Sequence, residues 1–208
     1  MSSQQAREYF WKSERIGFSK WRETDLDLAK SLWGDKEVSK YVFISEPTEQ
    51  MIIDRFHSEL ENQAKYGVAY WPIFTLCDNE FIGVTGLKAY SFEPGDTLEG
   101  CYMLGYHLMK NAWGKGYATE AAKACVKYAF ENLNASNIFA GHHPHNEASG
   151  KVLLKSGFYL KMSIFFPFTK MNHPIYYYKK DDRCLVKWME DPEAYFKKLE
   201  SYKGAKKP

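Results

Sequence analysis

The chain has 208 residues, and its acidic and basic side chains nearly balance, with a net charge of +2. This length fits one domain with a substantial core, and the balanced charge gives no electrostatic case for bulk nucleic-acid binding. No apolar run is long enough to cross a bilayer, and the polar N-terminal residues do not form a signal peptide. The four cysteines form no C-x-x-C pair. We therefore expect buried, reduced thiols in a cytoplasmic protein.

The first third of the chain predicts one strand and two helices. Residues up to about Ser13 indicate a loose lead-in or a short helix, whereas Arg15 to Trp21 alternates enough to form a strand. Thr24 and Asp25 are typical N-caps of a helix that carries apolar residues at helical spacing. A second helix begins at 47–49, with apolar residues on one face.

From residue 70 the apolar period changes to that of strands. The predicted elements are strands at 70–76, 81–87 and 101–108, a long helix at 116–133, a strand at 137–141, a helix at 146–156, and closing strands at 158–166 and 175–178. The tail predicts a helical extension over about 182–203. Together these patterns predict a single α/β (α+β) domain over 1–208 with its core at about 15–180, in which helices flank a mixed, mostly antiparallel sheet.

Two glycines separated by one residue, Gly114 and Gly116, stand directly before the long predicted helix. Such glycines let backbone N–H groups turn toward an anion, and the helix N-terminus adds free donors and a favourable dipole. We therefore expect a phosphate-bearing ligand, a pyrophosphate above all. A Walker loop needs G-x-x-x-x-G-K-[ST], and a Rossmann fingerprint needs a third glycine where Thr119 stands. Neither pattern fits.

Residues 111–116 resemble the [QR]-x-x-G-x-[GA] motif of the GNAT superfamily of acetyl-CoA-dependent N-acetyltransferases, with Asn111 at the first position. Residues 146–158 resemble the later N-x-x-[AS]…G-F helix and turn of that family, and 104–108 resemble its splayed fourth strand. The resemblance covers roughly 15–178 and implies the GNAT fold. In detail the chain is similar to the branch that acetylates N-termini of ribosomal proteins. Acetyl-CoA is the co-substrate that this resemblance implies.

The resemblance also implies which residues hold acetyl-CoA. The pantetheine arm would pair with the backbone of Tyr106, His107 and Leu108, like an added strand, and a backbone N–H near Tyr106 or His107 would hold the oxyanion. The side-chain amide of Asn146 would also hold the pantetheine, although Asn146 is equally typical of a helix N-cap. The pyrophosphate would lie against the amides of Trp113, Gly114, Lys115, Gly116, Tyr117 and Ala118.

The catalytic acid is less well defined by the sequence. Many family members place a tyrosine seven residues after the asparagine, where this chain has Leu153. Ser149 stands where the ribosomal-protein-like branch places a serine near the sulfur, so Ser149 is the candidate acid. The alternative is that Ser149 is a small polar residue of a first helical turn.

The catalytic base is equally open. Relatives often carry a glutamate two residues before the strand glycine, where this chain has Met103. The candidate bases are Glu99, whose position is more typical of a solvated charge at a strand edge, and His142, whose residue type suits proton transfer near neutral pH. Deprotonation through water is a further alternative. The histidines at 142–145 lack the separated ligand pairs of a zinc site, so we predict no metal.

The predicted partners are acetyl-CoA and an amine acceptor, either a protein N-terminus or a small amine, with neither nucleic acid nor membrane. The aromatic residues Trp33, Tyr41, Phe43 and Trp71 either line an acceptor cleft or fill the core. The aromatic-rich closing strands fit either a monomer or a homodimer interface. The missing tyrosine and glutamate leave a second functional hypothesis, a degenerate GNAT fold that binds acyl-CoA as a sensor without turnover.

Overall fold

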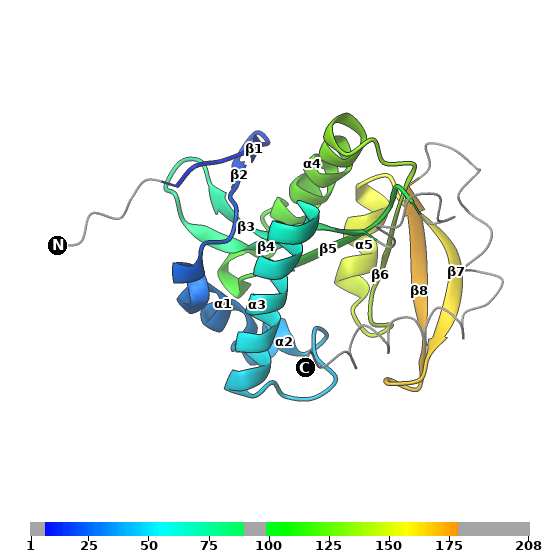
Figure 1. The fold of residues 1–208 in the computed structure, drawn as a ribbon. Helices are drawn as coiled ribbons and strands as arrows, with labels where there is room; N and C mark the ends of the chain where they lie inside the picture. Colours follow the sequence, from blue (N-terminus) through cyan, green and yellow to red (C-terminus); the bar gives the residue numbers. More distant parts are fainter. Residues whose placement is uncertain (1–6, 90–98, 179–208) are drawn as a thin grey trace.

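The structure is a computed structural model that describes residues 7–89 and 99–178. An eight-stranded sheet runs through these residues in the order β1-β2-β3-β4-β5-β6-β8-β7 (Figure 1). The strands are β1 (Trp11–Lys12), β2 (Ile16–Phe18), β3 (Tyr70–Thr75), β4 (Phe81–Ala89), β5 (Cys101–Leu108), β6 (Asn137–Gly141), β7 (Tyr159–Phe166) and β8 (Met171–Tyr178). Strands β5 and β6 pair in parallel, and the other neighbouring strands are antiparallel. The predicted mixed, mostly antiparallel sheet is confirmed.

Helices cover both faces of this sheet. They are α1 (Leu26–Trp33), α2 (Lys36–Ser39), α3 (Glu49–Tyr66), α4 (Tyr117–Asn132) and α5 (Glu147–Lys155), with short 3-10 turns at Glu23–Asp25 and Lys110–Ala112. Two adjacent residues of β5 define the two layers, because successive strand side chains point to opposite faces. Tyr106 bonds to α5, whereas His107 bonds to Trp33 at the end of α1. Helix α4 packs beside α5, on the Tyr106 face.

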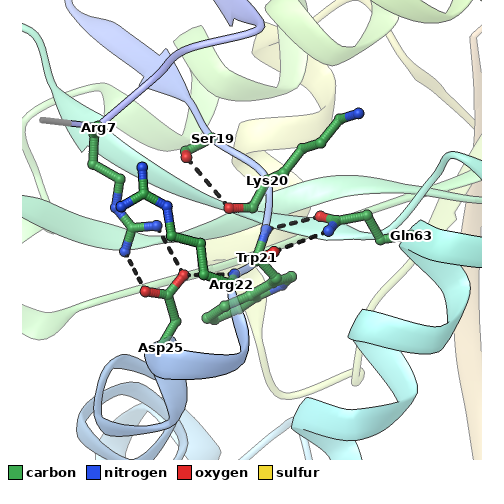
Figure 2. A network of polar contacts seen from close by, with 7 residues as sticks. All are labelled: Arg7, Ser19, Lys20, Trp21, Arg22, Asp25 and Gln63. Carbon is green, nitrogen blue, oxygen red and sulfur yellow. Dashed lines mark hydrogen bonds and ion pairs between the residues drawn. The ribbon is translucent and has the colours of Figure 1, made fainter. Parts of the chain in front are cut away.

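The N-terminal region differs from the prediction. Trp11 and Lys12 form a strand that pairs with β2, where a loose lead-in or a short helix was expected. Asp25 makes no side-chain cap bond for α1. Its carboxylate instead accepts from both terminal nitrogens of Arg7, at 2.6 and 2.8 Å, and from the backbone N–H of Arg22 (Figure 2). Asp25 stands at the predicted N-cap position of α1, but its side chain makes no cap bond there, because the Arg7 guanidinium 18 positions earlier takes its oxygens.

The remaining elements lie close to their predicted ranges. Helix α3 begins after Thr48, whose hydroxyl accepts from Met51 N as an N-cap should. The sequence missed α2, whose N-cap is Asp35. It also began the last strand four residues late, because a proline such as Pro174 argues against a strand interior. Pro174 nevertheless pairs in register with Ser163 of β7. The predicted tail helix at 182–203 lies outside the described residues.

The described cysteines occupy different environments. Cys101 and Cys125 are buried as predicted, but Cys77 is exposed, contrary to the expectation of buried thiols. Burial raises the pKa of the Cys125 thiol to about 12, so this residue is a packing element between α4 and Thr85 of β4. Cys184 lies outside the described residues. None of the helices that the structure describes is both long and apolar enough to cross a membrane.

Candidate functional site

The glycine loop before α4 presents unused backbone donors. Gly114 and Gly116 have φ angles of +73° and +82°, a region that side chains rarely adopt, and Gly116 is the N-cap of α4. A β-carbon at Gly114 would meet nothing within 4 Å. Within the described residues, no backbone or side-chain acceptor takes the N–H groups of residues 114–118. The loop and the helix N-terminus therefore offer adjacent donors to an anion.

Trp113 differs from the other five residues predicted to hold the pyrophosphate. Its backbone N–H donates to the carbonyl of Lys110 at 3.2 Å, and its indole N–H donates to the carbonyl of Leu108 at 2.8 Å. Both donors of Trp113 are thus used within the loop. Asn111, the residue that departs from the family motif, donates to the Glu80 carboxylate at 2.9 Å. Trp113 therefore stabilises the loop from inside, and Asn111 ties the start of the loop to the residue before β4.

The turn between β1 and β2 fixes the other side of the loop. Glu120 of α4 accepts from the Ser13 hydroxyl, from the backbone N–H of Arg15 and from Arg15 Nε, each at 2.7 Å. Arg15 Nη1 also donates to the Lys115 carbonyl at 3.1 Å, and its guanidinium lies over the Tyr117 ring. Hydrogen bonding by Ser13 and Arg15 outweighs burial and lowers the pKa of the Glu120 carboxyl. The hairpin therefore holds the loop through a charged pair.

Strand β5 leads into this loop with a free edge. It pairs with β6 at three positions, Cys101 with Asn137, Tyr102 with Ile138 and Met103 with Phe139. The pairing ends there, although β5 continues to Leu108. Among the described strands, the β6 side of Tyr106, His107 and Leu108 is thus unpaired. An extended ligand can hydrogen-bond to such an edge as an added strand would.

Four polar side chains gather beside this free edge. Tyr106 donates to the carbonyl of Ser149 at 2.9 Å and lies 2.9 Å from its hydroxyl oxygen. Because the single phenol proton is used, the Ser149 hydroxyl donates to Tyr106. His142 and Tyr176 stack on each other, with His142 Nε2 3.4 Å from the Tyr176 hydroxyl. Burial raises the pKa of Tyr106 well above its ordinary value, so its phenol stays protonated.

Gly150 of α5 leaves room for His142, which follows β6, and for Tyr176 of β8. A β-carbon at this position would lie 2.8 Å from His142 Nε2 and 3.1 Å from the Tyr176 hydroxyl. The Nδ1 atom of His142 lies 2.8 Å from the His143 carbonyl, which can only accept, so Nδ1 carries a proton. In the neutral ring, Nε2 is then the free basic nitrogen, and it faces Tyr176.

The structure separates the other predicted residues. Asn146 is the N-cap of α5, with Oδ1 accepting from Ser149 N at 3.3 Å, which leaves its amide NH₂ as a donor. Glu99 precedes β5, where its carbonyl accepts from Ser136, at the end of the strand opposite to the free edge. The structure therefore does not bring Glu99 to Tyr106 and Ser149. Leu153, at the position of the family tyrosine, is buried in the core.

His143 and His145 lie on the loop after β6 and His173 lies in β8, and the His143 ring meets the other two edge to face. His143 stacks against Tyr41 and contacts the rings of His145 and His173. Burial, aided by His143 and His142, lowers the pKa of His173 to about 4, and its Nε2 lies 2.7 Å from the Thr169 hydroxyl. Among the described residues, no group of three metal-ligating side chains is placed to hold an ion.

The opposite face of β5 carries a second polar group. Trp33 donates to His107 Nδ1 at 3.2 Å, which places the proton of the neutral ring on Nε2. Burial, assisted by the charges of Arg55 and Lys88, lowers the pKa of His107 well below its ordinary value. The Tyr70 ring lies over Gly105 and fills the space that a side chain at position 105 would occupy. Trp71, the other tryptophan predicted either to line an acceptor cleft or to fill the core, packs against Tyr128 of α4.

Sequence reasoning missed several members of these groups. Tyr176 lies in a predicted strand, but nothing in its local pattern indicates that it meets His142. Arg55, Glu59 and Lys88 are ordinary charged residues in their segments, although Glu59 stands at helical spacing from Ile52 and Phe56, on the apolar face of its helix. A carboxylate beside two apolar neighbours at Phe56 and Leu60 is a weak signal at best.

The fold is shared with solved acetyltransferases. A solved acetyltransferase of the GNAT family from Bacillus anthracis superposes with a TM-score of 0.67 at 24% identity, covering 81% of this chain and 95% of that one. The family model for the acetyltransferase (GNAT) domain matches residues 15–159. This chain belongs to the GNAT family of acetyltransferases. It is an acyltransferase, and acetyl-CoA is its co-substrate.

Several curated relatives carry N-acetyltransferase names, among them the following two. The chain is 34% identical over 149 residues to the uncharacterized N-acetyltransferase p20 of Bacillus licheniformis, which covers 68% of this chain and 77% of the relative. It is 32% identical over 108 residues to the [ribosomal protein uS5]-alanine N-acetyltransferase of Escherichia coli (strain K12). The second match covers 51% of this chain and 50% of that relative.

Proposed function

We propose that this acetyltransferase moves the acetyl group of acetyl-CoA to a primary amine, by direct attack in a ternary complex. The acceptor is a protein N-terminus or a small amine. The observation that carries this proposal is the free edge of β5 that leads into the unused donors of residues 114–118. An extended cofactor bound along both would present its thioester where Tyr106 and Ser149 meet. Proximity then supplies much of the rate.

The cofactor contacts of this proposal follow the loop and the edge. The amides of Gly114, Lys115, Gly116, Tyr117 and Ala118 hold the pyrophosphate, while Trp113 shapes the loop from within. The pantetheine arm bonds to the backbone of residues 106–108 and to the side-chain amide of Asn146. A backbone N–H at Tyr106 or His107 stabilises the oxyanion as it forms.

The proton transfers of this proposal use side chains of the α5 face. The amine nitrogen attacks the thioester carbon, the oxyanion collapses, and the C–S bond breaks. The Ser149 hydroxyl turns from Tyr106 to the departing thiolate and gives up its proton. The Tyr106 phenol then redirects its own hydrogen bond from the Ser149 carbonyl to the serine oxygen, which regains a proton from solvent. His142 Nε2, directly or through Tyr176 or water, takes the proton that the amine must lose. Glu99 has no part in this proposal because of its place at the far end of β5.

Calorimetric titration with acetyl-CoA, followed by an assay of free-thiol release with a panel of amines and peptides, tests the proposal. The Gly114→Val, Gly116→Val double variant should lose acetyl-CoA binding, since both positions have positive φ and both side chains would stand in the loop. Gly67→Val is a matched control, because Gly67 also has positive φ but lies at the end of α3. Unchanged affinity in the double variant would refute the loop assignment. Tight binding without turnover of any amine would favour the sensor hypothesis.

A further inference from the structure

A second polar group lies on the face of β5 that is opposite to Ser149, and its charges do not balance. Glu59 of α3 is fully buried, with Oε1 3.1 Å from Lys88 Nζ and 3.9 Å from an Arg55 terminal nitrogen. Two cations thus share one carboxylate. Burial lowers the pKa of the neighbouring His107 well below its ordinary value, so this ring is uncharged near neutral pH. Burial lowers the pKa of the Lys88 ammonium and Glu59 opposes that shift, so with Lys88 protonated the group carries one positive charge in excess.

Arg55 is the member with the weakest pairing. Its side chain is 21% exposed, yet its one ion pair among the described residues is the 3.9 Å contact to Glu59, and its buried Nε has no hydrogen-bond partner there. The guanidinium lies over the rings of Trp33 and Phe43, at 4.9 and 5.7 Å from their centroids. These contacts hold the planar group in place but satisfy none of its N–H donors. A mostly buried guanidinium in this state is stabilised by an incoming anion.

The position of this group relates it to the acceptor. Lys88 is the partner of Met103 in the pairing of β4 with β5, so the two side chains share a face. The Lys88 ammonium lies over the Tyr70 ring, 4.7 Å from its centroid, and that ring covers Gly105. Ser149 and the α5 helix occupy the other face. An amine that attacks a thioester at Gly105 and Tyr106 from the face opposite to Ser149 therefore arrives on the side of Lys88 and Arg55, and its proton reaches His142 through water along the free edge.

We infer that Arg55 and Lys88 form an anion subsite for the acceptor, which selects primary amines that carry a carboxylate close to the reacting nitrogen. The planar Arg55 fork suits a carboxylate, and Lys88 adds a point charge. Glu59 is a positioning residue: it accepts from the backbone N–H of Tyr70 at 2.9 Å and holds both cations toward the strand face. This inference rests on the proposed function, because it names the class of acceptor for that reaction. The carboxylate comes either from a free amino acid or from an acidic first residue of a peptide.

Matched acceptors distinguish these sources. One pair consists of amidated peptides that differ in having Glu or Gln as the first residue, and the other consists of alanine and alaninamide. We expect a preference for the acid in at least one pair, of about ten- to a hundredfold in kcat/KM, the size of a charge-assisted hydrogen bond. Arg55→Met keeps an apolar stem on Trp33 and should abolish the preference. Lys65→Met, which removes an exposed charge of the same helix, should leave it unchanged.

Further measurements keep the inference separate from folding and from turnover. Thermal unfolding checks each variant, and Lys88→Met replaces Arg55→Met if the latter does not fold. Equal or better use of the amides, or an acid preference that survives both variants, would overturn the anion subsite while leaving acetyl transfer intact. If no amine is acetylated, that result refutes the proposed function, and the anion subsite is tested separately. Calorimetric titration of the CoA-saturated protein with the Glu and Gln peptides then decides the subsite, and equal affinity would refute it.

Discussion

The hydrogen bonds between Tyr106 and Ser149 give the sharpest test of the proposed acid. Tyr106→Phe removes one phenol oxygen and with it the two contacts of 2.9 Å to the Ser149 carbonyl and hydroxyl. The ring itself stays, so the packing against α5 is kept. The change leaves the backbone of residues 106–108 free to bind the cofactor.

The magnitude follows from these two bonds. Each intramolecular hydrogen bond contributes about 0.5–1.5 kcal/mol net, so the variant should lose about 1–3 kcal/mol of unfolding free energy. For a domain of this size each kcal/mol shifts Tm by about 2–4 °C, so we expect a decrease of about 2–12 °C. A general acid contributes about a hundredfold or more to rate, and a serine that has lost its partner should keep part of this. We therefore expect kcat to fall by roughly tenfold or more.

Three measurements check this prediction: the melting temperature, the affinity for acetyl-CoA by calorimetry, and kcat from thiol release. Tyr102→Phe is the matched control, since Tyr102 lies on the same strand and face as Tyr106 and makes no hydrogen bond in the described structure. The control should change neither affinity nor kcat. A Tyr106→Phe enzyme with wild-type kcat would refute the role of this pair in protonating the thiolate. A loss of acetyl-CoA affinity in place of kcat would assign Tyr106 to binding.

Three further predictions concern stability and binding. Asp25→Ala leaves the buried Arg7 guanidinium without its partner and should cost about 3–5 kcal/mol in urea unfolding, whereas Glu46→Ala at an exposed pair should change little. His173 has its pKa lowered to about 4 in the folded state, so the unfolded chain binds more protons between pH 6.5 and 4. Unfolding free energy should therefore fall across that window on acidification, and less steeply in His173→Gln than in wild type or the exposed control His57→Gln. Asn146→Asp keeps the cap of α5 and should keep Tm while weakening acetyl-CoA binding; equal affinity would limit Asn146 to capping.

Local patterns in the sequence predicted most of the secondary structure and the glycine loop at 114–116. The ranges 101–108 and 137–141 were predicted as they stand, because a short apolar run is a property of each segment alone. The loop at 114–116 was equally visible, since positive φ at both positions requires glycine whatever surrounds them. The start of α3 was predicted at 47–49, and its Thr48 cap is equally local, because the Met51 partner lies three residues away.

The tertiary structure decided which distant residues meet. Strand β1 has two residues, too few for a pattern, and it exists because β2 lies beside it. Asp25 had the right residue type for a cap, but Arg7 competes for its oxygens and a bidentate ion pair is the stronger partner. Glu99 was a candidate base, but it precedes β5, and the free edge beside Ser149 begins only beyond Met103, where pairing with β6 stops.

The same distinction separates the two parts of the proposed site. The donors for the cofactor are consecutive in the chain, so the sequence by itself determined them. The Tyr106–Ser149 contact spans 43 positions, and Lys88 meets Glu59 across a strand and a helix. Such contacts depend on sheet order, register and helix placement, which arise from the packing of the whole core and not from any local period. The sequence therefore determined the family and the acetyl donor, and the fold decided which distant side chains meet in the proposed site.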